Sequence, residues 1–574
     1  MTSLRFIDLC AGIGGFHLAI HQVVGETAEC VLAAEVDPEL RETYVRNFHA
    51  SGLSHAYAKH HASAAQDDKF GDLFDVYGRL RRIHGDVNDL LDASGEDLRS
   101  YADGTPLVPE HDLLCAGFPC QPFSKSGSQL GFGDSRGTVF GAILTILRAR
   151  RPKYILLENV GNLEAHDRGR TWETIRRSLE DVGYSLAWTS HVKSGGSGLL
   201  SPHHIGEPHH RERFFVVGQL KNSAGSISDS PFPLPIRRSD KAQVAAGMSS
   251  DRLDSILDGT GPSATTKLSH QQKACIEIWE ELLSWISAHE EVRREDEASL
   301  IPLPSFPIWG WELDPFHAYP NSPPQDSTEF PPASRTELPD FFGTRDELLA
   351  EYQSLGVVLP IPARTWARPG GAHPYEFMEQ APQYARRAKW PRWKWRFVSQ
   401  NRKWARGLWS ALIVSRVVSP EEVRDWLERL FLLPASFQKL EWNCRFSEIT
   451  LAGKVLQCRP SGLRARPYGQ IPALVAMTTT QVPIVSHAGT LKGYRHLTIS
   501  EGLQLQGFPR RWHLPIGESP MHDRVKAFKA LGNAVHVGLV SAILQKWAIK
   551  NRKPFGEPDY GPNSSQDLDG TPSM

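Results

Sequence analysis

Residues 4–20 read Leu-Arg-Phe-Ile-Asp-Leu-Cys-Ala-Gly-Ile-Gly-Gly-Phe-His-Leu-Ala-Ile, and this stretch decides the fold. Its first part, Leu4–Leu9, is a largely apolar run typical of a buried strand. The glycines of 11–15 let the backbone turn tightly, and a helical pattern begins at Phe16. A strand, a glycine turn and a helix in this order predict the first unit of an α/β fold.

The same alternation continues along the first 220 residues. Helical patterns lie between further short apolar runs, for example at Val139–Arg150 and Trp172–Leu179. The expected strands after the first are Val31–Ala34, 82–84, Asp112–Cys115, Tyr154–Leu157 and Phe214–Gly218. Strands that alternate with helices predict a parallel, doubly wound sheet.

Composition narrows the classes of protein. The chain has 574 residues, 40% of them hydrophobic and 22% charged, which is ordinary for a globular protein of several domains. The net charge of −1 means that any surface for a polyanion must be local. Seven cysteines do not form a disulfide framework at this length, which favours a reducing, cytoplasmic setting. The N-terminus has no signal-peptide layout, and we expect no membrane span.

The composition of the sequence changes after about residue 219. Residues 221–270 are rich in Ser, Asp, Gly and Pro, which predicts a linker or a mobile loop. Cys275–Arg294 has the pattern of an amphipathic helix, and 301–343 interleaves prolines with aromatic residues. A compact pattern resumes at Leu474, and 551–574 is expected to be a disordered tail.

A cysteine follows the fourth predicted strand. Residues 115–124 read Cys-Ala-Gly-Phe-Pro-Cys-Gln-Pro-Phe-Ser, so Gly117 and Pro119 force an irregular loop that carries Cys120. A loop at the carboxyl end of a parallel strand is where open α/β folds place their chemistry. A thiolate there would be a strong nucleophile. The alternative is a small buried hydrophobic residue, which most free cysteines are.

Acidic residues close three successive strands beside the glycine turn. Asp8, Glu35 and Asp86 stand at these strand ends, with Gly12, Gly14 and Gly15 in the turn. Carboxylates there can accept from ribose hydroxyls and an adenine amino group, which favours an adenosyl ligand. The full G-x-G-x-x-G pattern is absent, which disfavours a dinucleotide, and a plain turn is the alternative.

Two further polar motifs point toward a heterocyclic substrate. Glu158 closes the fifth strand, where it could hold or deliver a proton, or serve only as a structural hydrogen-bonding group. Arg211 and Arg213 share a face if the segment before Phe214 is extended, which suits a phosphate or a carbonyl. A solvated charge run is the alternative. The paired histidines 203–204 and 209–210 lack a second cluster with zinc spacing, so we expect no metal.

Residues 384–409 combine many cations and aromatic side chains with no acidic residue. That mixture suits a surface that follows phosphates and contacts bases. Gln400 and Asn401 add side chains that can read base edges. The alternative is a Trp-rich core with cations that reach solvent at its edge.

With these motifs in order, the chain resembles the DNA (cytosine-5)-methyltransferases. The resemblance covers residues 4–218 and about 457–547. It is carried by Phe6–Phe16, Gly117–Ser124, Glu158–Val160, Arg211–Arg213, 495–498 with Gln504–Pro509, and Gly532–Val535. The chain departs from the family pattern at Glu207-Pro208-His209, where Val-Pro-Gln is usual, and at Val36, where an aromatic residue is frequent.

The resemblance implies a Rossmann-like, doubly wound methyltransferase sheet with an inserted, irregular target-recognition domain. The expected bounds are 1–220 for the first part of the catalytic domain, 221–490 for recognition, and 491–550 for the hinge and the helix that complete the catalytic domain. The family uses S-adenosylmethionine and duplex DNA. The enzyme would act as a monomer on DNA, as the modification enzyme of a restriction-modification system whose endonuclease acts separately.

The resemblance also assigns residues. Cys120 would attack cytosine, Glu158 would handle a proton on the ring, and Arg211 and Arg213 would contact the flipped nucleotide. The implied cofactor residues are Phe6, Asp8, Gly12, Gly14, Gly15, Glu35, Val36, Asp86, Val87, Pro119, Asn533 and Val535. The expected DNA contacts are Ser124, Ser126, Arg136, Arg392, Lys394, Arg396, Gln400, Asn401 and Arg402.

Three alternatives remain. An RNA cytosine methyltransferase would use the same chemistry. A sequence-specific DNA-binding protein without turnover would not need Cys120, Glu158 and Arg213 together. A nicotinamide oxidoreductase is disfavoured by the incomplete glycine pattern.

Overall fold

The computed structural model divides the chain into two compact units. Unit 1 comprises Met1–Ile256, Pro472–Ala476 and Ile499–Met574, and unit 2 comprises Leu257–Ile471 and Met477–Thr498. The structure describes residues 4–50, 83–100, 104, 106–119, 138–189, 198–221, 243–259, 261–293, 303–304, 307–313, 401, 404–405, 407–409, 411–413, 415–444, 448–459, 462–474, 481–486, 493–515 and 519–550.

Unit 1 is built on a seven-stranded sheet of order β3-β2-β1-β4-β5-β8-β6. Its strands are β1 (Leu4–Leu9), β2 (Ala28–Ala34), β3 (Ile83–His84), β4 (Leu113–Gly117), β5 (Tyr154–Val160), β6 (Tyr184–Trp188) and β8 (Arg213–Leu220). The chain winds outward from β1 through β2 to β3, and then in the other direction from β4 to β5. The order therefore reverses between β1 and β4, and ligands of open α/β sheets bind at such a point.

One strand departs from the expected parallel sheet. β8 pairs antiparallel with both β5 and β6, although the sequence alternation had predicted parallel strands throughout. The described part of the connection from β6 to β8 contains only the short turn Pro202–Ile205 and β7 (His209–His210). An antiparallel neighbour needs no crossover helix, so β8 enters the sheet between β5 and β6 in the opposite direction.

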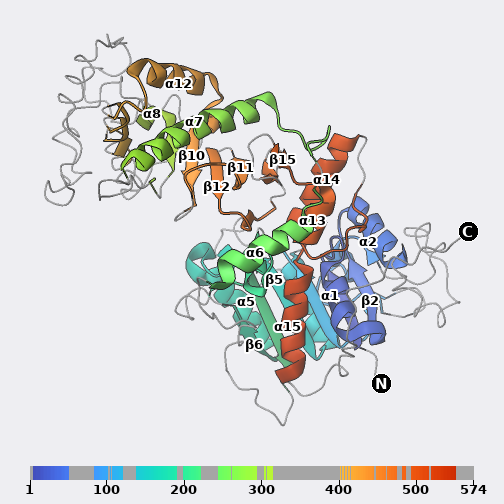
Figure 1. The fold of residues 1–574 in the computed structure, drawn as a ribbon. Helices are drawn as coiled ribbons and strands as arrows, with labels where there is room; N and C mark the ends of the chain where they lie inside the picture. Colours follow the sequence, from blue (N-terminus) through green and yellow to red (C-terminus); the bar gives the residue numbers. More distant parts are fainter. Residues whose placement is uncertain are drawn as a thin grey trace, which may run out of the picture. The chain divides into compact units, whose positions relative to one another are not determined.

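Helices cover both faces of this sheet. α4 (Val139–Arg150) and α5 (Arg170–Asp181) pack on the face that carries Ile7 and Leu9. α1 (Gly15–Val24) lies on the other face, where its His17 contacts Phe6 with ring centroids 5.1 Å apart. Figure 1 shows α15 (Val537–Lys550) beside α1 on this face, and α2 (Pro38–Ala50) lies beyond them.

The C-terminal segment of unit 1 packs on its N-terminal elements. α13 (Ile499–Leu505) and α14 (Pro520–Asn533) precede α15. Trp512 Nε1 donates to the Ile13 carbonyl in the glycine turn at 3.0 Å, and Asn47 exchanges two hydrogen bonds with the His513 backbone. The first and last parts of the chain therefore share one core.

Two helices lie at the C-terminal end of unit 1. α14 ends at Asn533 and α15 begins at Val537, so Asn533 stands at a helix end. By length and composition His522–Lys546 could cross a membrane, but 78% of its apolar window is buried inside the protein. We interpret these helices as core elements of unit 1.

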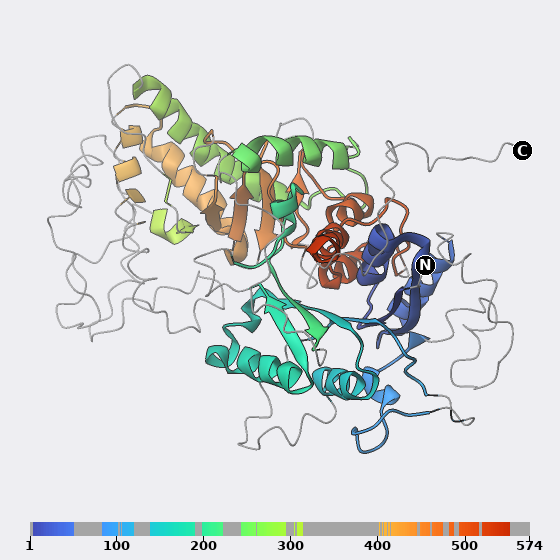
Figure 2. The ribbon, with the colours of Figure 1, turned by 90° about the horizontal axis from the view of Figure 1, so that it is seen from below.

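Unit 2 contains a six-stranded sheet of order β15-β14-β11-β12-β10-β9, seen in Figure 2 with its helices. Its strands are β9 (Ile308–Trp309), β10 (Lys439–Trp442), β11 (Val455–Arg459), β12 (Gly462–Arg466), β14 (Ile484–Val485) and β15 (Arg495–His496). α7 (His270–Arg293), α8 (Gly310–Leu313) and α12 (Pro420–Leu432) pack with it around one core. A further short pair joins β7 and β13 (Ile471–Pro472).

Tryptophans dominate the core of unit 2. Trp279, Trp409 and Trp426 are fully buried, and each donates its indole N–H to a backbone carbonyl. Trp409 belongs to the basic and aromatic stretch 384–409, and its neighbour Leu408 is also in this core. The described C-terminal end of that stretch is therefore structural. Its cation-rich part, 384–400, lies outside the described residues.

The segment expected to be a linker contains a helix. α6 (Gln243–Ile256) lies within 221–270 and belongs to unit 1, so the boundary between the units falls at Ile256 rather than near residue 220. α7 extends the expected helix Cys275–Arg294 by five residues at its N-terminal end. Residues 551–574, which were expected to be a disordered tail, lie outside the described part of the chain.

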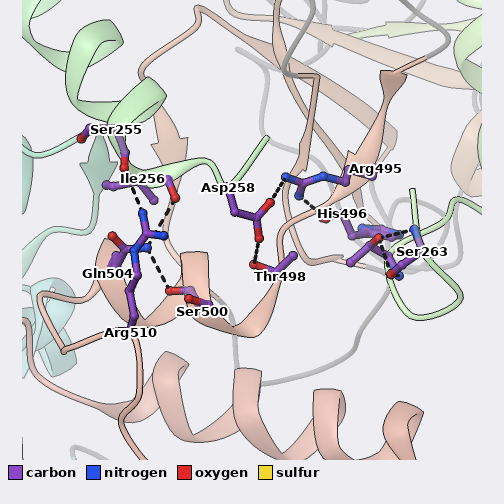
Figure 3. Close-up of polar contacts among 11 residues, drawn as sticks. Ser255, Ile256, Asp258, Ser263, Arg495, His496, Thr498, Ser500, Gln504 and Arg510 are labelled. Carbon is purple, nitrogen blue, oxygen red and sulfur yellow. Dashed lines mark hydrogen bonds and ion pairs between the residues drawn. The ribbon is translucent and has the colours of Figure 1, made fainter. Parts of the chain in front are cut away.

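Polar contacts flank the points where the chain passes between the units (Figure 3). In unit 1, Arg510 donates to the Ser255 carbonyl at 3.2 Å and Gln504 to the Ile256 carbonyl at 3.4 Å. In unit 2, the buried Arg495 forms an ion pair with Asp258 at 3.0 Å. The chain is thus fastened within each unit close to the crossings after Ile256 and after Thr498.

Candidate active site

The site lies at the carboxyl ends of β4 and β5. Gly117, the last residue of β4, is paired with Glu158 of β5 in the parallel register. Phe118 is buried, Pro119 is exposed, and Cys120 is the first residue beyond this described stretch. The described chain therefore leaves the sheet beside Glu158 and ends one residue before Cys120.

Asn159 fixes the start of that loop. Its Nδ2 donates to the Phe118 carbonyl at 2.8 Å, and its Oδ1 accepts from the Val160 amide at 2.8 Å. Because Asn159 is buried, these bonds hold the backbone two residues before Cys120 with little competition from water. Sequence reasoning included Asn159 in a motif but gave it no role. Its role could have been suspected from the sequence, because Asn159 is a polar residue at the end of an apolar strand and directly follows the candidate acid Glu158.

Glu158 forms an ion pair with Arg213. Arg213 Nε lies 2.9 Å from Glu158 Oε1, and both side chains are largely shielded from solvent. β5 and β8 run antiparallel, with Glu158 opposite Phe215 and Val160 opposite Arg213. The antiparallel entry of β8 therefore brings the two charged groups together at one edge of the sheet. A paired guanidinium fixes the orientation of the carboxylate.

Arg211 is placed differently from the expectation. Its guanidinium is buried and donates to the Gly532 and Ala534 carbonyls, each at 2.7 Å, so it grips the end of α14. Burial, with the nearby charge of Arg213, lowers the pKa of Arg211 to about 9, and Glu158 opposes this change. In this structure Arg211 holds backbone near the end of α14, as a positioning residue would, and its contact with substrate stays a prediction.

The glycine turn needs its glycines for two different reasons. Gly14 has φ +89°, and a Cβ there would come within 2.3 Å of Phe48, so no side chain fits. A Cβ on Gly15 would lie 2.5 Å from Val535, which brings the two predicted cofactor motifs into contact. At Gly12, with φ +55°, a Cβ would meet no described atom within 4 Å, so the turn is open to a ligand there.

Acidic groups converge on this turn. Glu35 accepts from the Gly12 amide at 2.8 Å through Oε2 and from the Asp37 amide at 3.0 Å through Oε1. Cys10, which sequence reasoning missed, stands in the turn with φ +56°. Burial, followed by the charges of Glu35, Asp8 and Asp86, raises the pKa of the Cys10 thiol to about 12. The signal that could have revealed Cys10 is its place between the strand and the glycines.

Several predicted cofactor residues reach solvent around the turn. Asp86 is exposed, and its Oδ1 accepts from the Asn88 amide at 2.9 Å. Val36 is 68% exposed, and Asn533 is also exposed, whereas Val87 and Val535 are buried. These features suit a nucleoside. The open space at Gly12 leaves room for it, the acidic groups at the strand ends can accept from ribose hydroxyls, and the exposed Val36 side chain can pack against the flat face of the base.

Two of the predicted cofactor residues do not face this space. Phe6 and Asp8 point from β1 toward the face covered by α1, and both are fully buried. Burial raises the pKa of Asp8 well above its usual value, the His17 backbone amide opposes this, and Glu35 adds to it. Side chains alternate between the two faces along β1, so Phe6 and Asp8 share the face that α1 covers, and their contact with a cofactor stays a prediction. Phe6 and Asp8 lie in the strand that leads into the glycine turn.

The predicted DNA contacts lie almost entirely outside the described residues. These positions are Ser124, Ser126, Arg136, Arg392, Lys394, Arg396, Gln400 and Arg402. Asn401 is described, is 1% exposed, and donates to the Pro307 carbonyl at 2.9 Å, so it does not present its amide to a base. Over the described stretches, no three His, Cys, Asp or Glu side chains are grouped to hold a metal ion.

The described site is thus an acid–arginine pair at the edge of a doubly wound sheet, next to the strand end that precedes Cys120. The model of the C-5 cytosine-specific DNA methylase family matches residues 4–77, 50–295 and 392–548. The chain belongs to this family, and it is a DNA cytosine-5 methyltransferase.

The chain is similar to several methyltransferases. The type II methyltransferase M.AluI of Cellulosimicrobium cellulans is 28% identical over 592 residues, which cover 95% of this chain and 92% of that protein. M.HhaI of Haemophilus parahaemolyticus is 34% identical over 235 residues, 41% of this chain and 54% of that protein. The solved S. pombe Dnmt2 methyltransferase covers 96% of this chain and 100% of its own at 14% identity, with a TM-score of 0.41.

Proposed function

We propose that this enzyme transfers a methyl group from S-adenosylmethionine to carbon 5 of a flipped cytosine in a short, specific sequence of duplex DNA. One observation carries the proposal: the Glu158–Arg213 pair lies beside the strand end that leads into the Cys120 loop. A nucleophile, a proton-handling group and a fixed cation at one edge are what this chemistry needs.

Carbon 5 of cytosine is a poor nucleophile, so the reaction needs covalent activation. The Cys120 thiolate adds to carbon 6, while Glu158 holds a proton at ring nitrogen 3, so that the adduct is an enamine. Carbon 5 then takes the methyl group. Loss of the proton from carbon 5 restores the double bond and expels the Cys120 thiolate.

Arg213 has two tasks in this scheme. It orients the Glu158 carboxylate through the 2.9 Å pair, and its remaining N–H groups are available to the carbonyl of the base or to the nucleotide backbone. Arg211 takes no part in the chemistry and holds the 532–534 backbone instead.

The residues around the glycine turn fit the methyl donor. Glu35 and Asp86 would meet the ribose and the adenine, with Gly12 leaving room for the backbone approach and Val36 beside the base. Pro119, Asn533 and the Gly15–Val535 contact complete the surroundings. S-adenosylmethionine, when bound, supplies an electrophilic methyl group.

The target base must leave the duplex before Cys120 can reach it, because carbon 6 is inaccessible in a stacked helix. Duplex DNA is therefore the partner of this site, and the enzyme would act as a monomer on it in the cytoplasm. The type II relatives support a role in restriction and modification, with an endonuclease that acts separately.

Labelled S-adenosylmethionine tests the proposal directly. The full-length protein is incubated with the labelled donor and either mixed-sequence duplex DNA or tRNA, with the Cys120→Ser variant as the control. We expect label at carbon 5 of cytosine in DNA alone, and none with the variant. Label only in tRNA would replace the DNA proposal by the RNA one, and label in DNA from the Cys120→Ser variant would exclude the covalent route.

A further inference from the structure

The sheet of unit 2 has two chemically different faces. Along β10, β11 and β12 the residues alternate, so Leu440, Leu456 and Leu463 point into the core beneath α7 and α12. The opposite face carries five charged side chains on these three adjacent strands, one of which is Lys439 of β10. We call the other four the arginine face; it consists of Glu441, Arg459, Arg464 and Arg466.

One carboxylate serves several cations on this face. Glu441 Oε1 lies 2.7 Å from Arg464, and its Oε2 lies 3.5 Å from Arg459. Burial opposes ionisation of Glu441, but hydrogen bonding and the charges of Arg464, Arg459 and Lys439 lower its pKa below the usual value. Among the described residues, these guanidinium groups therefore outnumber the carboxylates of this face, which leaves an excess of positive charge.

The third arginine shows the consequence of this excess. Burial, together with the like charges of Arg464 and Arg459, lowers the pKa of Arg466, and the charge of Glu441 opposes that only in part. The Nε atoms of Arg464 and Arg466 are buried and have no hydrogen-bond partner among the described residues. Within the described part of this face guanidinium groups outnumber carboxylates, and a phosphate at the partly exposed Arg459 and Arg464 side chains would supply negative charge.

On the helix-covered side of the same unit, a cation is matched by a carboxylate. On α12, Arg429 pairs with Glu281 of α7 at 2.8 Å, one cation with one carboxylate. The whole chain has a net charge of −1, so the arginine face is a local concentration of cations and not a reflection of a basic protein. The side chains remain accessible, with Arg459 31% and Arg464 19% exposed.

We propose that the arginine face binds the phosphate backbone of the duplex DNA substrate. This inference rests on the proposed function and places a phosphate-binding surface of unit 2 on β11 and β12, at residues that the sequence motifs did not single out. Such contacts position the protein on DNA without reading its sequence.

The test measures the affinity for mixed-sequence duplex DNA as a function of salt, using the full-length protein. Each lost phosphate contact flattens the slope of log affinity against log salt by about 0.9. We expect the double variant Arg459→Gln, Arg464→Gln to flatten the slope by about 1.8. The matched control Lys273→Gln, Arg429→Gln removes two charges from the helix layer and should leave the slope unchanged.

Glu441→Gln separates this proposal from a purely structural network. Removing the counter-charge should tighten binding of DNA and should not flatten the slope, which is the opposite of the arginine variants. A network that only holds the sheet together would weaken binding in both cases, in parallel with a loss of thermal stability.

The outcomes are distinct. An unchanged slope in a folded arginine double variant overturns the inference. If that variant does not fold, Arg459→Gln alone and Glu441→Gln decide it, since Arg459 is the more exposed partner. Failure of the wild-type protein to bind duplex DNA at all would overturn the proposed function itself.

Discussion

Arg213 of β8 lies 2.9 Å from Glu158 of β5, and the two strands run in opposite directions. Arg213 was expected to contact the flipped nucleotide, and Glu158 was expected to handle a proton on the cytosine ring. In the structure these two side chains form an ion pair. Because Arg213 is fixed by the sheet and not by a loop, the carboxylate is oriented before any substrate arrives.

Replacing Glu158 tests its role as the proton-handling group. We expect Glu158→Gln to reduce single-turnover methyl transfer by about 10²–10⁴-fold, which is the usual effect of removing such a group. Binding of S-adenosylmethionine should persist. The control Asp181→Asn removes an exposed carboxylate at the end of α5 and should retain full activity. Activity of Glu158→Gln within a factor of about three would contradict the role.

Arg211 and Arg213 should respond differently to the same change. Arg211→Lys loses the two-pronged grip on the Gly532 and Ala534 carbonyls, so we expect a raised KM for S-adenosylmethionine and faster amide exchange near 532–535. Its kcat should fall little. Arg213→Lys should lower kcat instead. If Arg211→Lys lowered kcat without changing KM or exchange, Arg211 would have to touch the base.

Asp8 provides a test by pH. Its carboxyl loses a proton near pH 3.8 in the unfolded chain but only at a higher pH in the folded protein, because it is buried. Between these values the folded state holds the extra proton, so this group makes stability fall as pH rises, by at most about 1.4 kcal/mol per pH unit.

Asp8→Asn removes that slope. The variant should gain stability relative to wild type as the pH rises from 4 to 7, measured by urea unfolding, and the difference should shrink toward pH 4. Affinity for S-adenosylmethionine should be unchanged, because Asp8 faces α1. A large loss of cofactor affinity in a folded variant would restore Asp8 as a ligand.

The Asp258–Arg495 pair should stabilise unit 2 near the crossing of the chain. A double-mutant cycle with Asp258→Asn and Arg495→Gln should give a coupling energy of about 0.5–3 kcal/mol in urea unfolding. Thr498→Val, which removes a long 3.4 Å contact to Asp258, is the weaker comparison and should cost less. Strictly additive effects of the two main substitutions would show that the pair contributes nothing.

Many helices and strands of unit 1 could be predicted from the sequence, because the local sequence patterns there agree with the observed secondary structure. The predicted helix at Val139–Arg150 has those bounds in the structure, with Thr138 as its N-cap. The strands before Gly117 and Glu158 were also predicted, and they set the two at one edge. Family resemblance then supplied chemistry that the pattern alone left open.

Other features depend on long-range packing that no local pattern encodes. Arg211 and Arg213 are two residues apart, yet one reaches residues 532–534 and the other Glu158. Asp8 was expected to bind the cofactor because it stands near a strand end, and the structure buries its side chain on the face of β1 that α1 covers. Asn401 looked like a base-reading residue, and the Trp-rich core of unit 2 buried it instead.

A covalent trap tests the central claim, that Cys120 attacks the cytosine ring. The protein is incubated with S-adenosylmethionine and a mixed-sequence duplex in which one strand carries 5-fluorocytosine at every cytosine. Fluorine cannot leave carbon 5 as a proton does, so the adduct cannot break down after methyl transfer. We expect a protein–DNA adduct stable to denaturation, whose peptide map places the DNA on Cys120, and none with Cys120→Ser. An adduct on any other cysteine, or no adduct from protein that methylates ordinary duplex DNA, would contradict the account.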